Sequence, residues 1–389
     1  MSSNSVGPLV YLIACEPSGD QLGAALMNAL REESAGAVRF AGVGGPLMKA
    51  AGLQSLFDIR ALALLGIFEV LPKTFLVLDR VKKTVADIEA TAPDILVTID
   101  SWGFTGRVHQ RLARKKSPIP RVRYVAPQVW AWRPGRAKQL ARWIHHLMAL
   151  LPFEPPYFQK HGLATTWVGH PVLEGGFNLG DGAAFRGQHG IAADKKLLCI
   201  LPGSRRSEVG RLLPVFREAV ILLKERYPDL HVVMPTVDTV AHDVRAVAAH
   251  WPVSITVVMG AAQRRDAVAA SDAALAASGT VSLELAMAGV PHIIAYRVHP
   301  LSALIFRLFR RTRFVNLVNI LVGHEAVPER LQGRCRADVL AEDLGLLLRD
   351  DTRRVAQRAD FSAALGKLSP GEERPSRRAA KVVLSLIGR

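Results

Sequence analysis

The segment Leu9-Val-Tyr-Leu-Ile-Ala-Cys-Glu-Pro-Ser-Gly-Asp20 begins with six apolar residues and ends in a polar turn. Apolar residues then recur with helical spacing over 22–30, which predicts a strand, a turn and a helix. The start of such a helix offers backbone N–H groups to an anion. We take Glu16 as a candidate catalytic residue and Ser18 as a candidate phosphate contact. Ser18 or Asp20 is also expected to cap the helix, and capping alone explains these residues equally well.

Short apolar segments continue to alternate with helical patterns along the chain. Seven further segments of this kind are 94–99, 122–126, 147–151, 197–201, 230–234, 255–258 and 292–296. This alternation predicts an α/β fold with parallel sheets. The predicted strands fall into two groups, one on each side of residues 175–190.

Residues 175–190 contain six glycines and show no clear periodicity, which is typical of a linker. We therefore expect two Rossmann-like domains, 1–175 and 190–365, that face a central cleft. The basic tail, 366–389, is expected to form a helix that packs on the first domain or on a partner, which would make the chain a homodimer. A solvated charged helix is the alternative interpretation of this tail.

The composition is that of a globular protein, with 49% hydrophobic and 22% charged residues in a chain of 389. Three separated cysteines predict neither a disulfide framework nor a zinc site. No run of 18 apolar residues occurs, and the first apolar run is too short for a signal peptide, so we expect a cytoplasmic chain with only peripheral membrane contact.

The net charge of +16 predicts polyanionic partners. Nucleic acid is disfavoured, because the sequence has no RNP-like aromatic strand, no basic helix with heptads and no zinc-ligand spacing. Phosphorylated substrates and an anionic membrane surface are therefore the expected partners.

The segment Asp94-Ile-Leu-Val-Thr-Ile-Asp100 has the pattern of a buried strand that ends in a carboxylate. Catalytic residues of α/β proteins collect at this end of a strand. Asp100 is our candidate general base, because a carboxylate there could take the proton of an attacking hydroxyl. A cap for a helix that begins near Ser101 is the alternative.

The segment Tyr124-Val-Ala-Pro-Gln-Val-Trp-Ala-Trp-Arg-Pro-Gly-Arg136 gathers tryptophans and arginines in a loop bounded by prolines. Aromatic faces and guanidinium groups suit a sugar phosphate or an aromatic ring. The candidate contacts are Trp130, Trp132, Arg133 and Arg136. Burial of the tryptophans in a core is the alternative.

The second half contains a strand, 197–201, that runs into Pro202-Gly-Ser-Arg-Arg-Ser-Glu-Val209. This turn is a candidate clamp for a diphosphate. Its proposed members are Gly203, Ser204 and Arg205. The guanidinium would neutralise charge that develops on a departing diphosphate.

A second turn of this kind is Ala277-Ser-Gly-Thr-Val-Ser-Leu-Glu284, which follows a strand and opens a helix. Its N–H groups, at Ser278, Gly279 and Thr280, would face phosphate. Glu284 would accept hydrogen bonds from ribose hydroxyls. Two such turns in one domain predict binding of a nucleoside diphosphate.

Residues 62–78 are unusually apolar and lead into Arg80, Lys82 and Lys83. The pattern suits a helix on a membrane surface or an acyl-chain groove, and equally a core helix. The candidate membrane or acyl contacts are Leu64, Leu65, Phe68, Leu71, Phe75 and Leu76.

Taken together and in order, these motifs resemble the lipid-A-disaccharide synthase family over residues 9–335. The family pattern includes E-[AP]-S-G-D, a strand ending in Asp, V-W-A-W-R, L-P-F-E, V-G-H-P, L-P-G-S-R-x-x-E-V, A-S-G-T-x-x-L-E and a late Asn. In this chain the eight motifs correspond, in the same order, to 16–20, Asp100, 129–133, 151–154, 168–171, 201–209, 277–284 and Asn319.

The resemblance implies a GT-B glycosyltransferase of two Rossmann-like domains at the cytoplasmic face of the inner membrane. It implies that UDP-2,3-diacylglucosamine is joined to 2,3-diacylglucosamine 1-phosphate, giving UDP and a β-1,6-linked disaccharide, with no metal and no cofactor. Asp100 then matches the proposed base. Asn319 matches an asparagine important for function and is a candidate acceptor or phosphate contact, although a turn residue also fits.

The chain departs from the family pattern after its candidate base. Where members commonly read Asp-x-Pro-Asp-Phe, this chain has Trp102 and Gly103, so the second carboxylate is missing. Two other classes remain open: another GT-B enzyme that uses UDP-N-acetylglucosamine, against which the V-W-A-W-R loop argues, and a non-catalytic membrane-surface protein.

Overall fold

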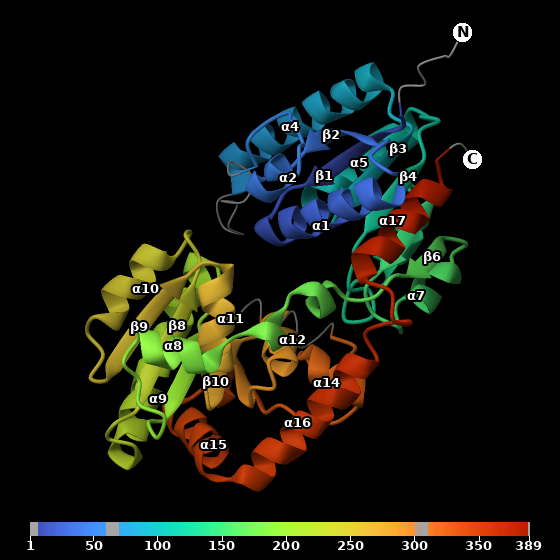
Figure 1. Cartoon of the computed structure of the whole chain (residues 1–389). Helices are drawn as coiled ribbons and strands as arrows, with labels where there is room; N and C mark the ends of the chain where they lie inside the picture. The colour runs from blue at the N-terminus through green and yellow to red at the C-terminus, as the bar shows by residue number, and fades with distance from the viewer. Residues whose placement is uncertain (1–6, 60–69, 300–302, 304–309, 388–389) are drawn as a thin grey trace. The chain divides into compact units, whose positions relative to one another are not determined.

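The computed structural model describes residues 7–59, 70–299, 303 and 310–387, with only the backbone at 70–74. The chain forms two compact units, each built on a parallel sheet (Figure 1). Unit 1 consists of Met1–Pro171 and Leu368–Arg389, and unit 2 of Val172–Lys367.

The sheet of unit 1 has the strand order β2-β1-β3-β4-β5-β6, and all its pairs are parallel. Its strands are β1 (Leu9–Ala14), β2 (Arg39–Val43), β3 (Ile95–Ile99), β4 (Arg121–Tyr124), β5 (His146–Ala149) and β6 (Ala164–Trp167). Its described helices are α1 (Pro17–Glu33), α2 (Pro46–Ala50), α4 (Val70–Thr91), α5 (Trp102–Arg114), α6 (Gly135–Ala141), α7 (Pro155–Gln159) and α17 (Pro375–Ser385). Successive strands lie on opposite sides of β1, so the carboxyl end between β1 and β3 is a topological switch point, where ligands bind in such sheets.

The residues of β1 alternate between two cores, as the two-residue period of a strand requires. Val10 and Leu12 pack in a core shared with α1 and α17. Tyr11 and Ile13 pack in a core shared with α4 and α5. Because both faces are covered by helices, the strand is a continuous apolar run.

The sheet of unit 2 has the order β12-β11-β10-β7-β8-β9, again with every pair parallel. Its strands are β7 (Leu197–Leu201), β8 (His231–Thr236), β9 (Ser254–Met259), β10 (Ala273–Ala277), β11 (His292–Tyr296) and β12 (Glu329–Leu331). Its described helices are α8 (Gly182–Gln188), α9 (Arg206–Arg226), α10 (Ala241–Ala248), α11 (Ala261–Ala269), α12 (Val281–Met287), α14 (Leu317–Val322), α15 (Ala337–Arg349) and α16 (Asp351–Gly366). Short 3-10 turns are η1 (Pro171–Glu174), η2 (Phe177–Leu179) and η3 (Gln332–Arg334). The switch point of this sheet lies between β7 and β10.

The glycine-rich residues 175–190 do not form the free linker that their composition predicts. The boundary between the units falls before them, and they belong to unit 2. A Cβ at Gly180 would lie 2.8 Å from the Cβ of Ala269, and one at Gly182 would lie 2.7 Å from the Ala269 carbonyl oxygen. The glycines therefore allow this segment to pack closely on the end of α11.

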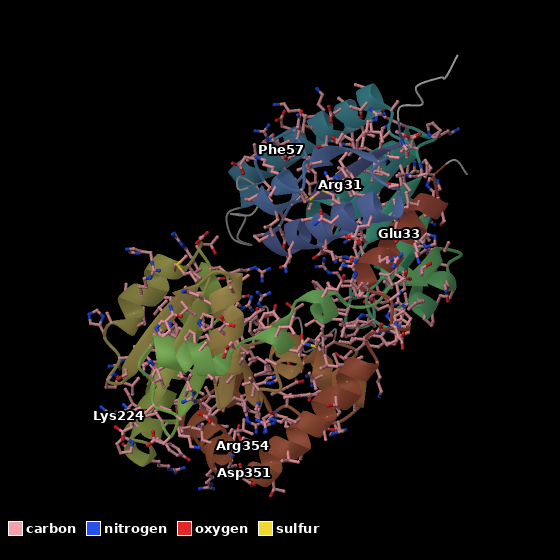
Figure 2. All side chains as sticks on the ribbon, in the orientation of Figure 1. Arg31, Glu33, Phe57, Lys224, Asp351 and Arg354 are labelled. Carbon is pink, nitrogen blue, oxygen red and sulfur yellow. The ribbon has the colours of Figure 1, made fainter. Side chains whose placement is uncertain are left out.

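The C-terminal helix α17 packs on α1 of unit 1 and contributes Ala379, Ala380 and Val383 to the same core. Ion pairs flank this contact: Arg374 lies 2.7 Å from Glu32, and Arg377 pairs with Glu33, which is labelled in Figure 2. The basic residues of the tail are thus partly neutralised by the acidic end of α1.

The apolar stretch at 62–78 is only partly described. Leu64, Leu65 and Phe68 lie outside the described residues, and Leu71 is described only as backbone of α4. Phe75 is 76% exposed on α4, and Leu76 is half-buried. Within the described ranges, no helix has the length and hydropathy needed to span a membrane.

Candidate active site

The candidate catalytic residues of unit 1 lie at its switch point. Glu16 follows β1 and is the N-cap residue of α1, whereas Asp100 follows β3. The Ser101 hydroxyl donates a hydrogen bond of 3.2 Å to Oε1 of Glu16. The structure therefore brings two loops together that are 85 residues apart in sequence.

The backbone at Asp100 has an uncommon conformation. Both Asp100 and Ser101 have positive φ angles, 46° and 48°, which is costly for residues with a side chain. The Thr105 hydroxyl donates to the carbonyl oxygen of Asp100 at 2.6 Å. Strain that is held in this way at the end of a strand is typical of functional sites.

The Asp100 carboxylate has a buried cation next to it. Nη2 of Arg123 lies 3.6 Å from Oδ1 of Asp100, and the Asp100 side chain is 50% exposed while that of Arg123 is 0% exposed. Burial lowers the pKa of Arg123 to about 10, and the nearby Asp100 opposes this shift. One side of the carboxylate thus faces the protein, and the other remains open to a substrate.

Asp20 has a different role from the predicted cap of α1. Its carboxylate accepts hydrogen bonds from the backbone N–H groups of Gly45, Leu47 and Met48, at 2.8, 2.9 and 3.0 Å. It therefore caps α2, because its position one turn inside α1 directs it away from the free N–H groups of its own helix. Ser18 is exposed in the first turn of α1 and forms no side-chain cap there.

The tryptophans of the 129–136 loop have separate environments. Trp130 is buried, its ring packs edge-on against Phe153 at 5.2 Å, and its indole N–H donates to Glu154 at 3.2 Å. The predicted substrate contact of Trp130 is not supported by this geometry, because the ring and its only donor are used inside unit 1. Trp132 is half-buried, so part of its ring reaches the surface.

Two arginines lie on the tryptophan faces at this surface. The Arg133 guanidinium lies 4.2 Å from the ring centroid of Trp132, and that of Arg136 lies 5.5 Å from Trp132 and 4.9 Å from Trp102. Burial, and then the neighbouring Arg133, lowers the pKa of Arg136. Among the described residues neither arginine has a carboxylate partner, so both can bind an anion.

The diphosphate candidates of unit 2 lie at its switch point. Gly203, with φ of 108°, lies in the loop after β7. The Glu208 carboxylate accepts the N–H groups of Ser204 at 3.2 Å and Arg205 at 3.4 Å, and it accepts a bond from the Arg205 guanidinium at 3.0 Å. Glu208 therefore shapes the loop, and the Arg205 side chain, which is 69% exposed, extends from it.

The loop after β10 lies on the other side of the same switch point. Ser278 is half-buried, and Gly279 and Thr280 are exposed just before α12. Glu284 pairs with Arg264 of α11, and burial raises the pKa of Glu284 while Arg264 opposes the shift. The ion pair orients this carboxylate close to the start of α12.

Asn319 does not reach the surface. Its amide donates to the Val327 carbonyl at 2.7 Å and to Glu329 at 2.9 Å, and its carbonyl oxygen accepts the Val327 N–H at 2.8 Å. The residue is fully buried. A substrate contact of Asn319 is therefore not supported, because its amide holds the loop between α14 and β12.

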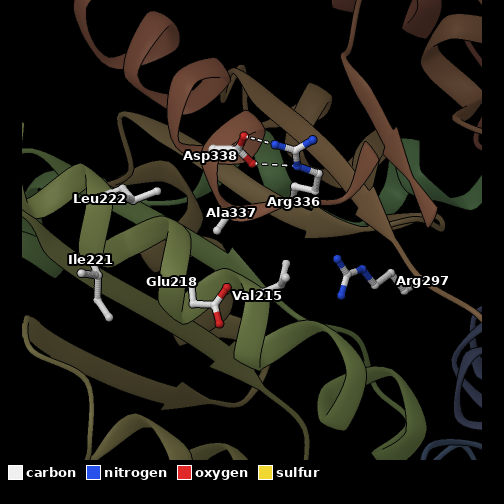
Figure 3. A pocket seen from close by; sticks show the side chains of 8 residues that line it. All are labelled: Val215, Glu218, Ile221, Leu222, Arg297, Arg336, Ala337 and Asp338. Atoms are coloured by element: carbon white, nitrogen blue, oxygen red, sulfur yellow. Dashed lines mark hydrogen bonds and ion pairs between the residues drawn. The ribbon is translucent and has the colours of Figure 1, made fainter. Parts of the chain in front are cut away.

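A cavity of about 530 Å³ on unit 2 lies apart from the predicted residues, none of which lines it (Figure 3). Its walls are the middle of α9, Arg297 after β11 and the start of α15. Across the described part of the chain, no group of three or more His, Cys, Asp or Glu side chains could hold a metal ion.

The chain is similar to known proteins along nearly its whole length, across both units. Residues 10–383 match the model of a family described as lipid-A-disaccharide synthetase. The chain belongs to this family. It is 53% identical over 381 residues to the lipid-A-disaccharide synthase of Paramagnetospirillum magneticum, which covers 97% of both chains. It is 52% identical to that of Rhodospirillum centenum, which covers 97% of this chain and 94% of the relative.

Solved structures of other proteins share the fold of this lipid-A-disaccharide synthase family member. The S. aureus MnaA–UDP co-structure matches with a TM-score of 0.67 at 15% identity and covers 98% of both chains. MurG of Acinetobacter baumannii matches with a TM-score of 0.57 at 16% identity and covers 98% of this chain and 99% of its own. These confirm the predicted α/β fold of GT-B type. The chain is therefore a glycosyltransferase that forms the lipid A disaccharide by transferring a hexose.

Several residues that shape the candidate site of this lipid-A-disaccharide synthase family member were not predicted from the sequence. Glu154 and Glu208 lie inside the motifs L-P-F-E and L-P-G-S-R-x-x-E-V, so a signal for them was present. Arg123 and Arg264 lie outside the motifs. For Arg123 the available signal was the alternation Arg121-Val-Arg123 in a strand with helices on both sides, since buried arginines need a partner.

Proposed function

We propose that the chain joins UDP-2,3-diacylglucosamine to 2,3-diacylglucosamine 1-phosphate, releasing UDP and forming a β-1,6-linked disaccharide 1-phosphate with inversion at the donor carbon. The observation that carries the proposal is the clustering of the motif residues at both switch points. Glu16 and Asp100 flank that of unit 1, and the loops at 203–205 and 278–280 flank that of unit 2. Ligands bind at this place in open α/β sheets.

In the proposed reaction, Asp100 accepts the proton of the acceptor 6-hydroxyl. The hydroxyl oxygen forms the bond to C1 of the donor sugar, the bond from C1 to the UDP oxygen breaks, and UDP leaves with that electron pair. The half-exposed Asp100 carboxylate is available for this proton transfer. Glu16, held by Ser101, provides a second carboxylate next to the base loop.

The nucleotide is proposed to bind unit 2. The loops at 203–205 and 278–280 would hold the diphosphate, the second through its N–H groups and the first through the Arg205 guanidinium, which would neutralise the charge of the leaving group. Arg205 suits this role because its side chain is 69% exposed on a loop whose backbone is fixed by Glu208. Glu284 is proposed to bind the ribose hydroxyls.

The 1-phosphate of the acceptor is proposed to bind Arg133 and Arg136, which lie on Trp132 and lack carboxylate partners in the described structure. Phe75, which is 76% exposed, and the nearby exposed Lys82 and Lys83 support peripheral contact with an anionic membrane surface. The proposed location is the cytoplasmic face of the inner membrane.

The test is a UDP-release assay in mixed micelles, with the diacylated UDP-glucosamine donor alone and together with the diacylated glucosamine 1-phosphate acceptor. Acceptor-dependent UDP release, with a β-1,6-linked disaccharide identified by NMR, is expected. UDP release without acceptor, or epimerisation of the donor, would overturn the proposed reaction.

A further inference from the structure

Arg123 is a fully buried cation whose contacts converge on Asp100. Its Nε donates to the Val125 carbonyl at 3.0 Å, and its Nη1 donates to the Thr105 hydroxyl at 2.8 Å. Nη2 is buried without a hydrogen bond and lies 3.6 Å from the Asp100 carboxylate. A buried guanidinium is costly unless its charge is paired, and Asp100 is the carboxylate that faces it.

The same guanidinium holds the backbone of Asp100. Nη1 of Arg123 orients Thr105, and the Thr105 hydroxyl in turn donates to the Asp100 carbonyl at 2.6 Å. Arg123 thus acts on the carboxylate directly and on the left-handed backbone through Thr105. Two contacts of this kind restrict both the position and the direction of the Asp100 side chain.

Trp102 lies over this arrangement. The Arg123 guanidinium lies 5.5 Å from the Trp102 ring centroid, and Arg136 lies 4.9 Å from it. The ring is half-buried and packs against Trp143, with centroids 5.9 Å apart. Trp102 therefore lies between the buried cation and the arginine-rich surface, at the position where this sequence departs from its family pattern.

Arg121 shows what a purely structural buried arginine looks like in the same strand. It is 6% exposed. Its guanidinium donates to the carbonyl oxygens of Trp143 at 2.8 Å, Ser117 at 2.8 Å and Ile119 at 3.3 Å. Arg121 has no contact with Asp100, whereas Arg123 is directed to it.

We propose that Arg123 is a positioning residue for the Asp100 carboxylate and that the Trp102 ring shields the Arg123 guanidinium from water. The proposal rests on the proposed function of Asp100 as the base. It assigns to Trp102 a supporting role that a Pro-Asp sequence at 102–103 would not provide.

The test compares Arg123→Met and Arg123→Lys with the matched control Arg121→Met, by kcat, KM, UDP affinity and melting temperature. Misplacement of a reacting group costs on the order of 100-fold. Arg123→Met is therefore expected to lower kcat by about that factor, with KM and UDP affinity unchanged. Arg123→Lys keeps the cation, so its kcat is expected to be about ten-fold higher than that of Arg123→Met. Arg121→Met is expected to lower the melting temperature but leave kcat within about three-fold.

A double-mutant cycle with Asp100→Asn separates positioning from a general structural defect. If Arg123 acts through Asp100, Arg123→Met causes no further loss in the Asp100→Asn background. Equal fold losses in both backgrounds, or equal behaviour of the Arg121 and Arg123 variants, would overturn the positioning role. Near-normal turnover of Asp100→Asn alone would instead overturn the base, so the two failures are distinguishable.

Discussion

The hydroxyl of Ser101 donates a hydrogen bond of 3.2 Å to Oε1 of Glu16. The two residues follow β3 and β1, the strands on either side of the switch point of unit 1. The bond therefore connects the loop of the candidate base to the start of α1. It makes the position of Glu16 depend on the left-handed backbone of the neighbouring loop.

Loss of this bond is expected to reduce turnover moderately. A hydrogen bond to a charged group contributes about 1.5 kcal/mol or more when buried, and this one is partly exposed. We expect Ser101→Ala to lower kcat by about 3- to 10-fold. Glu16→Gln should cause a larger loss, and the double variant should resemble Glu16→Gln alone. Independent, multiplicative losses would show that Ser101 does not act through Glu16.

Replacement of Asp100 tests the base directly. Asp100→Asn keeps the size of the side chain but cannot accept a proton, so turnover should fall by about 10²- to 10⁴-fold while UDP affinity is retained. The control is Asp94→Asn. Asp94 immediately precedes β3, at the end of the strand away from Asp100, and its carboxylate accepts the N–H of Leu9 at 2.6 Å. Stopped kinetic assays and UDP titration measure the two quantities. Turnover near that of the parent would remove Asp100 from the mechanism.

Gly203 is expected to tolerate no side chain. Its φ is 108°, and a Cβ there would lie 2.9 Å from the Cβ of Glu208. Gly203→Ala should therefore displace the loop, weaken UDP binding and lower the melting temperature. Gly210→Ala is the matched control, because Gly210 lies inside α9 with no atom near its added Cβ. This control should raise stability by about 0.5–1 kcal/mol. Unchanged UDP affinity in Gly203→Ala would argue against a diphosphate site in this loop.

Arg205 is expected to contribute to nucleotide affinity more than to stability. A charge-assisted hydrogen bond contributes about 1.5–3 kcal/mol, so Arg205→Ala should weaken UDP binding by about 10- to 100-fold. The melting temperature should change little, since the side chain is 69% exposed. Calorimetric titration at two salt concentrations measures the effect, with Arg226→Ala at the other end of α9 as the control. An affinity loss of equal size in both variants would point to a general charge effect.

Glu154 is expected to make stability depend on pH. Burial raises its pKa from 4.5 to about 7, although Leu151, Trp130 and Leu150 donate hydrogen bonds to it and oppose the shift. Between these values the folded chain binds more protons than the unfolded chain, so the free energy of unfolding decreases as pH rises from 4.5 to 7. The decrease is on the order of 3 kcal/mol.

Urea unfolding at pH 5 and pH 8 measures this effect as a difference between the parent and Glu154→Gln. The variant keeps a carbonyl acceptor for the indole N–H but carries no titrating carboxyl group. In Glu154→Gln the free energy of unfolding should no longer show the decrease that Glu154 causes between pH 5 and pH 8. Glu225→Gln, at an exposed site of unit 2, should show the same decrease as the parent. A parallel pH profile for parent and Glu154→Gln would contradict the raised pKa.

Most of the fold was predictable because the central strands are buried on both faces. Their apolar runs, such as 9–14 and 197–201, stand out in the sequence. Four strands had no predicted range: β2, β6 and β12 lie at sheet edges, and the central β10 was expected only as a strand before the turn at 277–284. Edge strands have partly exposed residues, as in Ala164–Trp167, so they lack a continuous apolar run.

The candidate site was predictable to the extent that its residues follow strands at fixed places in the chain. Glu16, Asp100 and Arg205 were proposed in this way, and the structure places them after β1, β3 and β7, because a parallel sheet collects the carboxyl ends of its strands at one edge. Trp130 and Asn319 were assigned to substrate contact because a motif does not state which way a side chain points. Their burial became visible only with the packing.

The family, the alternation of strands and helices and the positions of the turns after β7 and β10 were all evident from the sequence, since each depends on residues that are close together in the chain. Which distant groups meet became known only from the packed structure. Asp20 caps α2, which begins 26 residues later, and Arg123 faces Asp100 across two neighbouring strands. It also placed residues 175–190 against α11. Such pairings depend on strand order and on the competition of all buried polar groups for partners, and no local pattern encodes these.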